Sequence, residues 1–170
     1  QAETQKAMFP FVGNLYITQA SKEFTDTGYT NPSATWLSHS LDTVYALDLV
    51  DGISGRTLVA YAPYDAYIFS CGDFTILQSK YPVQLRDGSV TKVYAGFAHD
   101  NNAAWPAYPN KSEIRQGEKF YLEGDKGVPG SIHIHFEIKK GEFQNKTGVD
   151  WLTGNTSFGL VWDFASTFNP

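Results

Sequence analysis

Hydrophobic and polar residues alternate most regularly over residues 131–138, which read Ser-Ile-His-Ile-His-Phe-Glu-Ile. Successive side chains of a β-strand point to opposite faces, so this pattern predicts a strand with one polar and one apolar face. The polar face is predicted to carry Ser131, His133, His135 and Glu137. The apolar face is predicted to pack on a core through Ile132, Ile134, Phe136 and Ile138. A strand anchored in this way is a rigid platform for two neighbouring imidazoles.

Other apolar-rich segments are short and are separated by turn residues. They predict strands at 43–50, 56–62, 66–71, 74–79, 84–86, 90–98, 119–122 and 131–140. The dipeptides Gly72-Asp73 and Asp87-Gly88 predict hairpins between neighbouring strands. Residues 124–130 are rich in Gly and Pro and predict a turn before the histidine-bearing strand. We therefore expect an all-β fold with a mostly antiparallel sheet.

Long segments without regular strand patterns lie between and after these strands. The segments 19–38, 99–112 and 141–157 are rich in small, polar or turn-forming residues. Loops of this length in compact domains are commonly functional, so we expect them to form the walls of a groove over the sheet. The chain of 170 residues is long enough for one domain with its own core, and we expect a single domain over 1–170 with its centre at about 37–140.

Composition supports the β prediction and excludes several classes of partner. Aromatic residues make up 15% of the chain, and such residues favour strands. The net charge is -5 and there is no run of Lys or Arg, which argues against nucleic-acid binding. No stretch of about 18 apolar residues is present, so we expect no membrane span. The polar start without Met is expected of a mature chain from which an export signal was removed.

Candidate metal ligands can be enumerated because the chain has only four histidines. Asp48 alternates with Leu47 and Leu49, so it projects from the polar face of an otherwise apolar strand, where a carboxylate needs a cationic or hydrogen-bonding partner. His39, Asp48 and His135 together would supply two imidazoles and one carboxylate, a ligand set that leaves the fourth position of zinc open. The alternative is that His133 and His135 are two titratable but idle histidines on a half-buried strand.

Several short motifs resemble the lysostaphin-type (LytM-like, M23) family of zinc metallopeptidases. Residues 133–138 are similar to the family's His-Leu-His-Phe-Glu-Val motif, and residues 97–99 are similar to its Tyr-Ala-His. Ala62-Pro63 and the segment 114–118 also resemble family motifs, in the family's order. All four histidines fall on family positions. The resemblance covers about residues 37–140.

The resemblance implies one Zn²⁺ per chain, held by His39, Asp48 and His135. The resemblance also implies that His133 and His99 lie near the metal-bound water and the scissile carbonyl of the substrate. It does not decide which of the two histidines acts as the general base. The gap from His39 to Asp48 is longer than the family's commonest one, which leaves Asp42 as an alternative ligand. Glu137 is interpreted as a hydrogen-bonding partner of the site rather than as a base.

The function implied is a secreted or cell-envelope bacterial endopeptidase. It would hydrolyse peptidoglycan stem or cross-bridge peptides with a zinc-activated water. Two alternatives stay open. One is a catalytically degenerate module of the same type that binds the cell wall or a partner protein. The other is an aromatic-rich β-sandwich lectin, which would leave the positions of the histidines unexplained.

Overall fold

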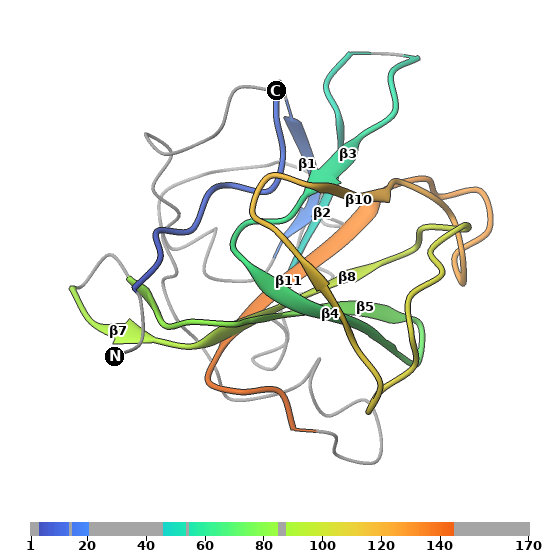
Figure 1. Cartoon of the computed structure of the whole chain (residues 1–170). Helices are drawn as coiled ribbons and strands as arrows, with labels where there is room; N and C mark the ends of the chain where they lie inside the picture. The colour runs from blue at the N-terminus through green and yellow to red at the C-terminus, as the bar shows by residue number, and fades with distance from the viewer. Residues whose placement is uncertain (1–3, 14, 21–45, 54, 85–87, 145–170) are drawn as a thin grey trace.

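A computed structural model of the chain describes residues 4–13, 15–20, 46–53, 55–84 and 88–144 (Figure 1). Every regular element in these ranges is a β-strand, so the all-β prediction is confirmed. Across the same ranges there is no helix long and apolar enough to cross a membrane. His39, Asp42 and most of the predicted groove walls at 19–38 and 141–157 lie outside the described residues.

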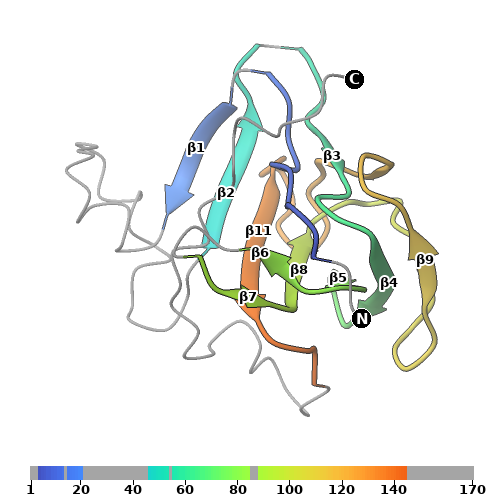
Figure 2. The same cartoon turned by 60° about the vertical axis from the view of Figure 1, so that its left-hand side comes forward.

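Seven strands form one antiparallel sheet in the order β1-β2-β11-β8-β5-β4-β9, and Figure 2 shows β1, β2 and β11 side by side. Their bounds are β1 Leu15–Ala20, β2 Ala46–Asp51, β4 Ala66–Cys71, β5 Phe74–Ser79, β8 Val93–Ala98, β9 Ser112–Ile114 and β11 Ile134–Lys140. Two small ribbons complete the fold. β3 (Val59–Tyr61) pairs with β10 (Lys119–Leu122), and β6 (Val83–Gln84) pairs with β7 (Val90–Thr91).

The predicted hairpin at Gly72-Asp73 is confirmed. Strands β4 and β5 pair in register up to Cys71 and Phe74, so two residues make the turn. Gly72 has φ of 60°, in the left-handed region that two-residue hairpin turns require and that glycine adopts without a steric penalty. Turn chemistry and strand pattern agree here, and for that reason the prediction was accurate.

One face of the large sheet packs on the main hydrophobic core. Phe136 of β11 is 3% exposed, and its ring centroid lies 5.1 Å from that of Phe97 on β8 and 5.6 Å from that of Phe11 in the N-terminal segment. Phe120 of the β3–β10 ribbon packs on Phe97 at 4.8 Å. Burying an aromatic side chain of this kind contributes about 1.5–3 kcal/mol, so β11 is firmly anchored.

The opposite face of the sheet carries the polar side chains of β11. His135 lies directly opposite Asp48 of β2 and Ala98 of β8, and Glu137 lies opposite Gly96 of β8. This face is also covered, because Asp48, Glu137 and Lys139 are all 5% exposed or less. The sequence pattern predicted a half-buried strand, and the structure shows that β11 is buried on both faces.

The prediction for Ile132 is wrong. This residue was expected on the core face, but its side chain is 58% exposed. The strand begins only at Ile134, because the preceding chain turns sharply, with Gly130 at φ of 83° and Ser131 N–H donating to the Val128 carbonyl. Alternation therefore starts two residues later than the sequence suggests, although His133 still forms a bridge with Gly124.

Other strand boundaries also differ from the predictions. The expected strand at 90–98 is divided into β7 and β8, and the one expected at 56–62 shortens to β3. Strands β1 and β9 were not predicted, and both lie at the edges of the sheet, where packing imposes less of a pattern. Asp48, Ala98 and His135 nevertheless all lie within strands, as predicted.

Candidate metal-binding and catalytic site

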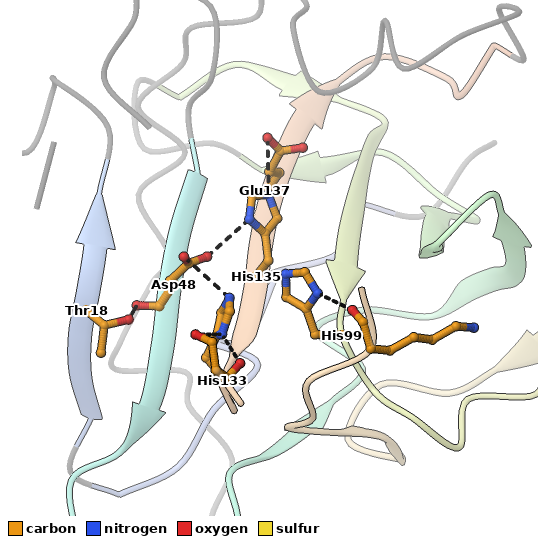
Figure 3. Close-up of polar contacts among 8 residues, drawn as sticks. Thr18, Asp48, His99, His133, His135 and Glu137 are labelled. Carbon is orange, nitrogen blue, oxygen red and sulfur yellow. Dashed lines mark hydrogen bonds and ion pairs between the residues drawn. The ribbon is translucent and has the colours of Figure 1, made fainter. Parts of the chain in front are cut away.

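Three neighbouring strands bring the candidate residues together (Figure 3). The pairing of β11 with β2 sets His135 beside Asp48, and the pairing of β11 with β8 sets it beside Ala98. His99 follows Ala98 directly at the end of β8, so the turn that leaves this strand carries its ring toward β11. Sheet register thus joins residues that are far apart in the sequence.

Asp48 is at the centre of this cluster. Its Oδ1 lies 3.1 Å from Nδ1 of His135, and its Oδ2 lies 3.4 Å from Nε2 of His133. The backbone carbonyl of Asp48 accepts a hydrogen bond from the hydroxyl of Thr18 on β1. The expected partner for this buried carboxylate is therefore present, in the form of two imidazoles.

His135 lies between two carboxylates. Its Nδ1 faces Asp48, and its Nε2 is 3.5 Å from Oε1 of Glu137. Burial opposes the charged imidazolium, but hydrogen bonds and charge attraction from Asp48 and Glu137 outweigh burial and raise the pKa of His135 to about 9. Without a metal ion, His135 is therefore a cation at neutral pH.

This pKa predicts a pH dependence of stability for the metal-free protein. The pKa of His135 is about 9 in the folded chain and about 6.5 in the unfolded chain, so the folded state binds the proton more tightly. The stabilisation is complete below about pH 6.5 and is lost as the pH rises toward 9. Thermal unfolding in the presence of a chelator should show the melting temperature falling across this interval. The Asp48→Asn variant should show a shallower fall, and a melting temperature that rises in this interval in wild type would contradict the prediction.

The rings of His133 and His99 lie close together, with their centroids 4.5 Å apart. Nδ1 of His133 lies 2.7 Å from the Ser131 carbonyl, and Nδ1 of His99 lies 2.8 Å from the Lys126 carbonyl. A carbonyl oxygen can only accept, so we assign the proton to Nδ1 in both rings. Each ring, when neutral, then has its lone pair at Nε2. Burial lowers the pKa of His99, which keeps that ring neutral at pH 7.

Asp48 and His135 fit the requirements of a zinc site. Two donors bound to one zinc at about 2.0–2.2 Å lie about 3.4 Å apart at tetrahedral angles, close to the separation of Asp48 Oδ1 and His135 Nδ1. Glu137 beside Nε2 of His135 would hold the proton on that nitrogen and leave the Nδ1 lone pair for a metal. The donor chemistry of these two residues is therefore that of a zinc ligand pair.

The described residues alone do not complete a metal-ligand set. No group of three or more His, Cys, Asp or Glu side chains within them is arranged to hold a metal ion. Four of the five predicted site residues, Asp48, His99, His133 and His135, lie together. The fifth, His39, and the alternative ligand Asp42 lie outside the described part of the chain, and Asp48 lies beside His135.

Two contributors to the cluster were not predicted. The carbonyl of Lys126 orients the His99 ring, and a backbone group leaves no signal in the side-chain pattern. Lys139 is 5% exposed on the same face as Glu137, and its Nζ has no hydrogen-bond partner among the described residues. Alternation from Glu137 could have placed Lys139 on this face, but the charge of lysine suggests an exposed position.

Two comparisons of the sequence with known proteins give no match. No protein-family model matches the chain, and no curated protein sequence is similar to it. Functional inference therefore depends on the geometry described above and on the resemblance of the short motifs.

Proposed function

We propose that the chain is a zinc-dependent endopeptidase that hydrolyses peptidoglycan stem or cross-bridge peptides. The observation that carries the proposal is the convergence of Asp48 and His135 with the rings of His133 and His99 on one face of the sheet. Two donors of zinc-ligand type and two further imidazoles in one cluster meet the requirements of metal-assisted hydrolysis. The motif resemblance to lysostaphin-type peptidases supports the same function.

In this proposal Asp48 and His135 hold zinc together with His39. When bound, zinc acts as a Lewis acid that lowers the pKa of water toward about 7 and polarises the substrate carbonyl. The role of Glu137 is to keep the proton on Nε2 of His135, which maintains the ligating tautomer. Metal binding must displace the Nδ1 proton of His135, so it competes with the ion pair to Asp48.

The two remaining histidines have different surroundings and therefore different proposed roles. Burial keeps His99 neutral, so its Nε2 can accept a proton from the attacking water. Nε2 of His133 lies 3.4 Å from Oδ2 of Asp48, so this ring lies directly beside the proposed ligand pair. We assign to His133 the remaining role, a position beside the oxyanion that develops on the substrate carbonyl.

Peptide hydrolysis tests the proposal directly. Zinc-loaded protein should cleave synthetic stem peptides or glycine-containing cross-bridge peptides, with the cleaved bond identified by mass spectrometry. Chelation should stop cleavage and added zinc should restore it, because hydrolysis depends on the metal. Absence of cleavage of either class of peptide, or of whole peptidoglycan, by protein with a full complement of zinc would contradict the proposal.

The second candidate is a non-catalytic module that binds the cell wall or a partner protein. The His135–Asp48 ion pair favours it, because an imidazolium between two carboxylates is a stable arrangement in its own right. Retention on peptidoglycan after full chelation, without hydrolysis when zinc is restored, would support this candidate over the enzyme.

A further inference from the structure

His99 has a strained backbone. Its φ is 93°, and it is the one non-glycine residue with positive φ in the part of the chain that the structure describes. A residue with a side chain is sterically strained in this region, so such a conformation persists only where the surroundings enforce it. The contacts that hold His99 in this backbone conformation therefore show which residues determine the position of its ring.

The segment 124–126 makes these contacts. The backbone N–H of Lys126 donates to the His99 carbonyl at 3.1 Å, and Nδ1 of His99 donates to the Lys126 carbonyl at 2.8 Å. Gly124 lies against the same carbonyl, since a Cβ added at Gly124 would be 2.2 Å from His99 O and 2.9 Å from the backbone N of Asn101. Gly124 does not have positive φ, so it is the lack of space, and not the backbone conformation, that requires glycine there.

The same segment also holds His133. Gly124 and His133 exchange two backbone hydrogen bonds, with Gly124 N–H donating at 3.2 Å and His133 N–H donating at 3.0 Å. The backbone of residues 124–126 therefore contacts both His99 and His133. The spacing between the two imidazole rings depends on these contacts. The ring centroids are 4.5 Å apart.

Asp125 secures this segment to its neighbours. Its Oδ1 accepts a hydrogen bond from the side-chain amide of Asn101 at 2.9 Å, and its Oδ2 accepts one from the backbone N–H of Gly130 at 3.0 Å. These bonds lower the pKa of Asp125, with the bond from Gly130 as the larger cause, so the carboxylate stays charged. Asp125 thus connects the chain after His99 to the turn that precedes His133.

We propose that Gly124 and Asp125 are positioning residues that hold the His99 ring against His133 for catalysis. The proposal rests on the proposed function for the role of His99, and the placement itself is independent of that function. Displacing a catalytic group by about 1 Å can cost about 100-fold in rate. A methyl group at Gly124 must displace neighbouring backbone, because the two nearest atoms that it would meet, His99 O and Asn101 N, belong to the backbone.

The test compares Gly124→Ala with Gly127→Ala in the full chain. Gly127 lies in the same turn with φ of 81°, and a Cβ there would meet nothing within 4 Å, so Gly127→Ala strains the turn without a clash and controls for strain in this segment. Gly124→Ala should retain zinc and cooperative unfolding while kcat falls about 10- to 100-fold with little change in KM. The ¹⁵N NMR signal of Nδ1 in His99, assigned with a His99→Gln variant, should shift in Gly124→Ala and stay unchanged in Gly127→Ala.

A second variant, Asp125→Ala, removes the connection without adding a clash, and it decides the question if Gly124→Ala does not fold. A wild-type His99 signal or unchanged kcat in the folded variants would overturn the proposal. A shifted His99 signal in a protein that hydrolyses no peptide would support the positioning while contradicting the proposed function.

Discussion

Replacing His135 with alanine is expected to abolish zinc binding and peptidase activity. The substitution removes Nδ1, the donor that faces Asp48, and zinc content should fall from about one ion per chain to nearly none. It also leaves Asp48 and Glu137 buried without the cation between them, which costs about 3–5 kcal/mol of stability. Zinc content, thermal unfolding and peptide hydrolysis measured on the same preparation would check all three effects.

The control for His135→Ala is Ile132→Ala, three residues earlier. Ile132 is exposed, so its truncation should change neither zinc content nor activity. A zinc-loaded and fully active His135→Ala variant would refute the role given to His135. Because a destabilised variant can lose zinc indirectly, the metal measurement is interpreted only at temperatures below the onset of unfolding.

Replacing His133 with alanine is expected to separate metal binding from catalysis. Zinc should remain, since Asp48 and His135 are unchanged, while kcat should fall about 10²- to 10³-fold, the range typical of removing one group that stabilises the oxyanion. The physical reason is the position of His133, whose Nε2 lies beside the Asp48 carboxylate and whose ring contacts that of His99. Elemental analysis together with steady-state kinetics measures both quantities.

Ser131→Ala is the matched control for His133→Ala. Nδ1 of His133 lies 2.7 Å from the Ser131 carbonyl, which alanine retains, and 3.4 Å from the Ser131 hydroxyl, which alanine removes. Because the shorter contact is kept, activity should stay close to wild type. Loss of zinc from His133→Ala would make His133 a ligand instead of a catalytic group. Full activity in His133→Ala would remove it from the mechanism altogether.

Strand β11 was predictable because its local pattern and its packing agree. Ile134 and Phe136 are apolar at alternate positions, and both are buried in the core. The same alternation predicted His135 and Glu137 on one face of the strand. Asp48 and His135 were predicted to be ligands of the same metal ion. The register between β2 and β11 places the two residues opposite each other.

Features that depend on tertiary contacts were not predictable. Ile132 reads as part of the strand, but the turn at Gly130 delays the start of β11. The alternating pattern cannot show what covers the polar face, and for that reason the burial of Glu137 and Lys139 was missed. The strained conformation of His99 follows from contacts with 124–126, a segment that the sequence marks only as a turn.

Zinc content per chain tests the central claim most directly. Elemental analysis of wild type, Asp48→Ala and Asp42→Ala, purified without chelator, compares the ligand beside His135 with the alternative left open by the motif spacing. The account predicts about one zinc in wild type and in Asp42→Ala, and nearly none in Asp48→Ala. Wild-type protein that holds no zinc even after incubation with the metal, or Asp48→Ala protein that retains it, would contradict the account.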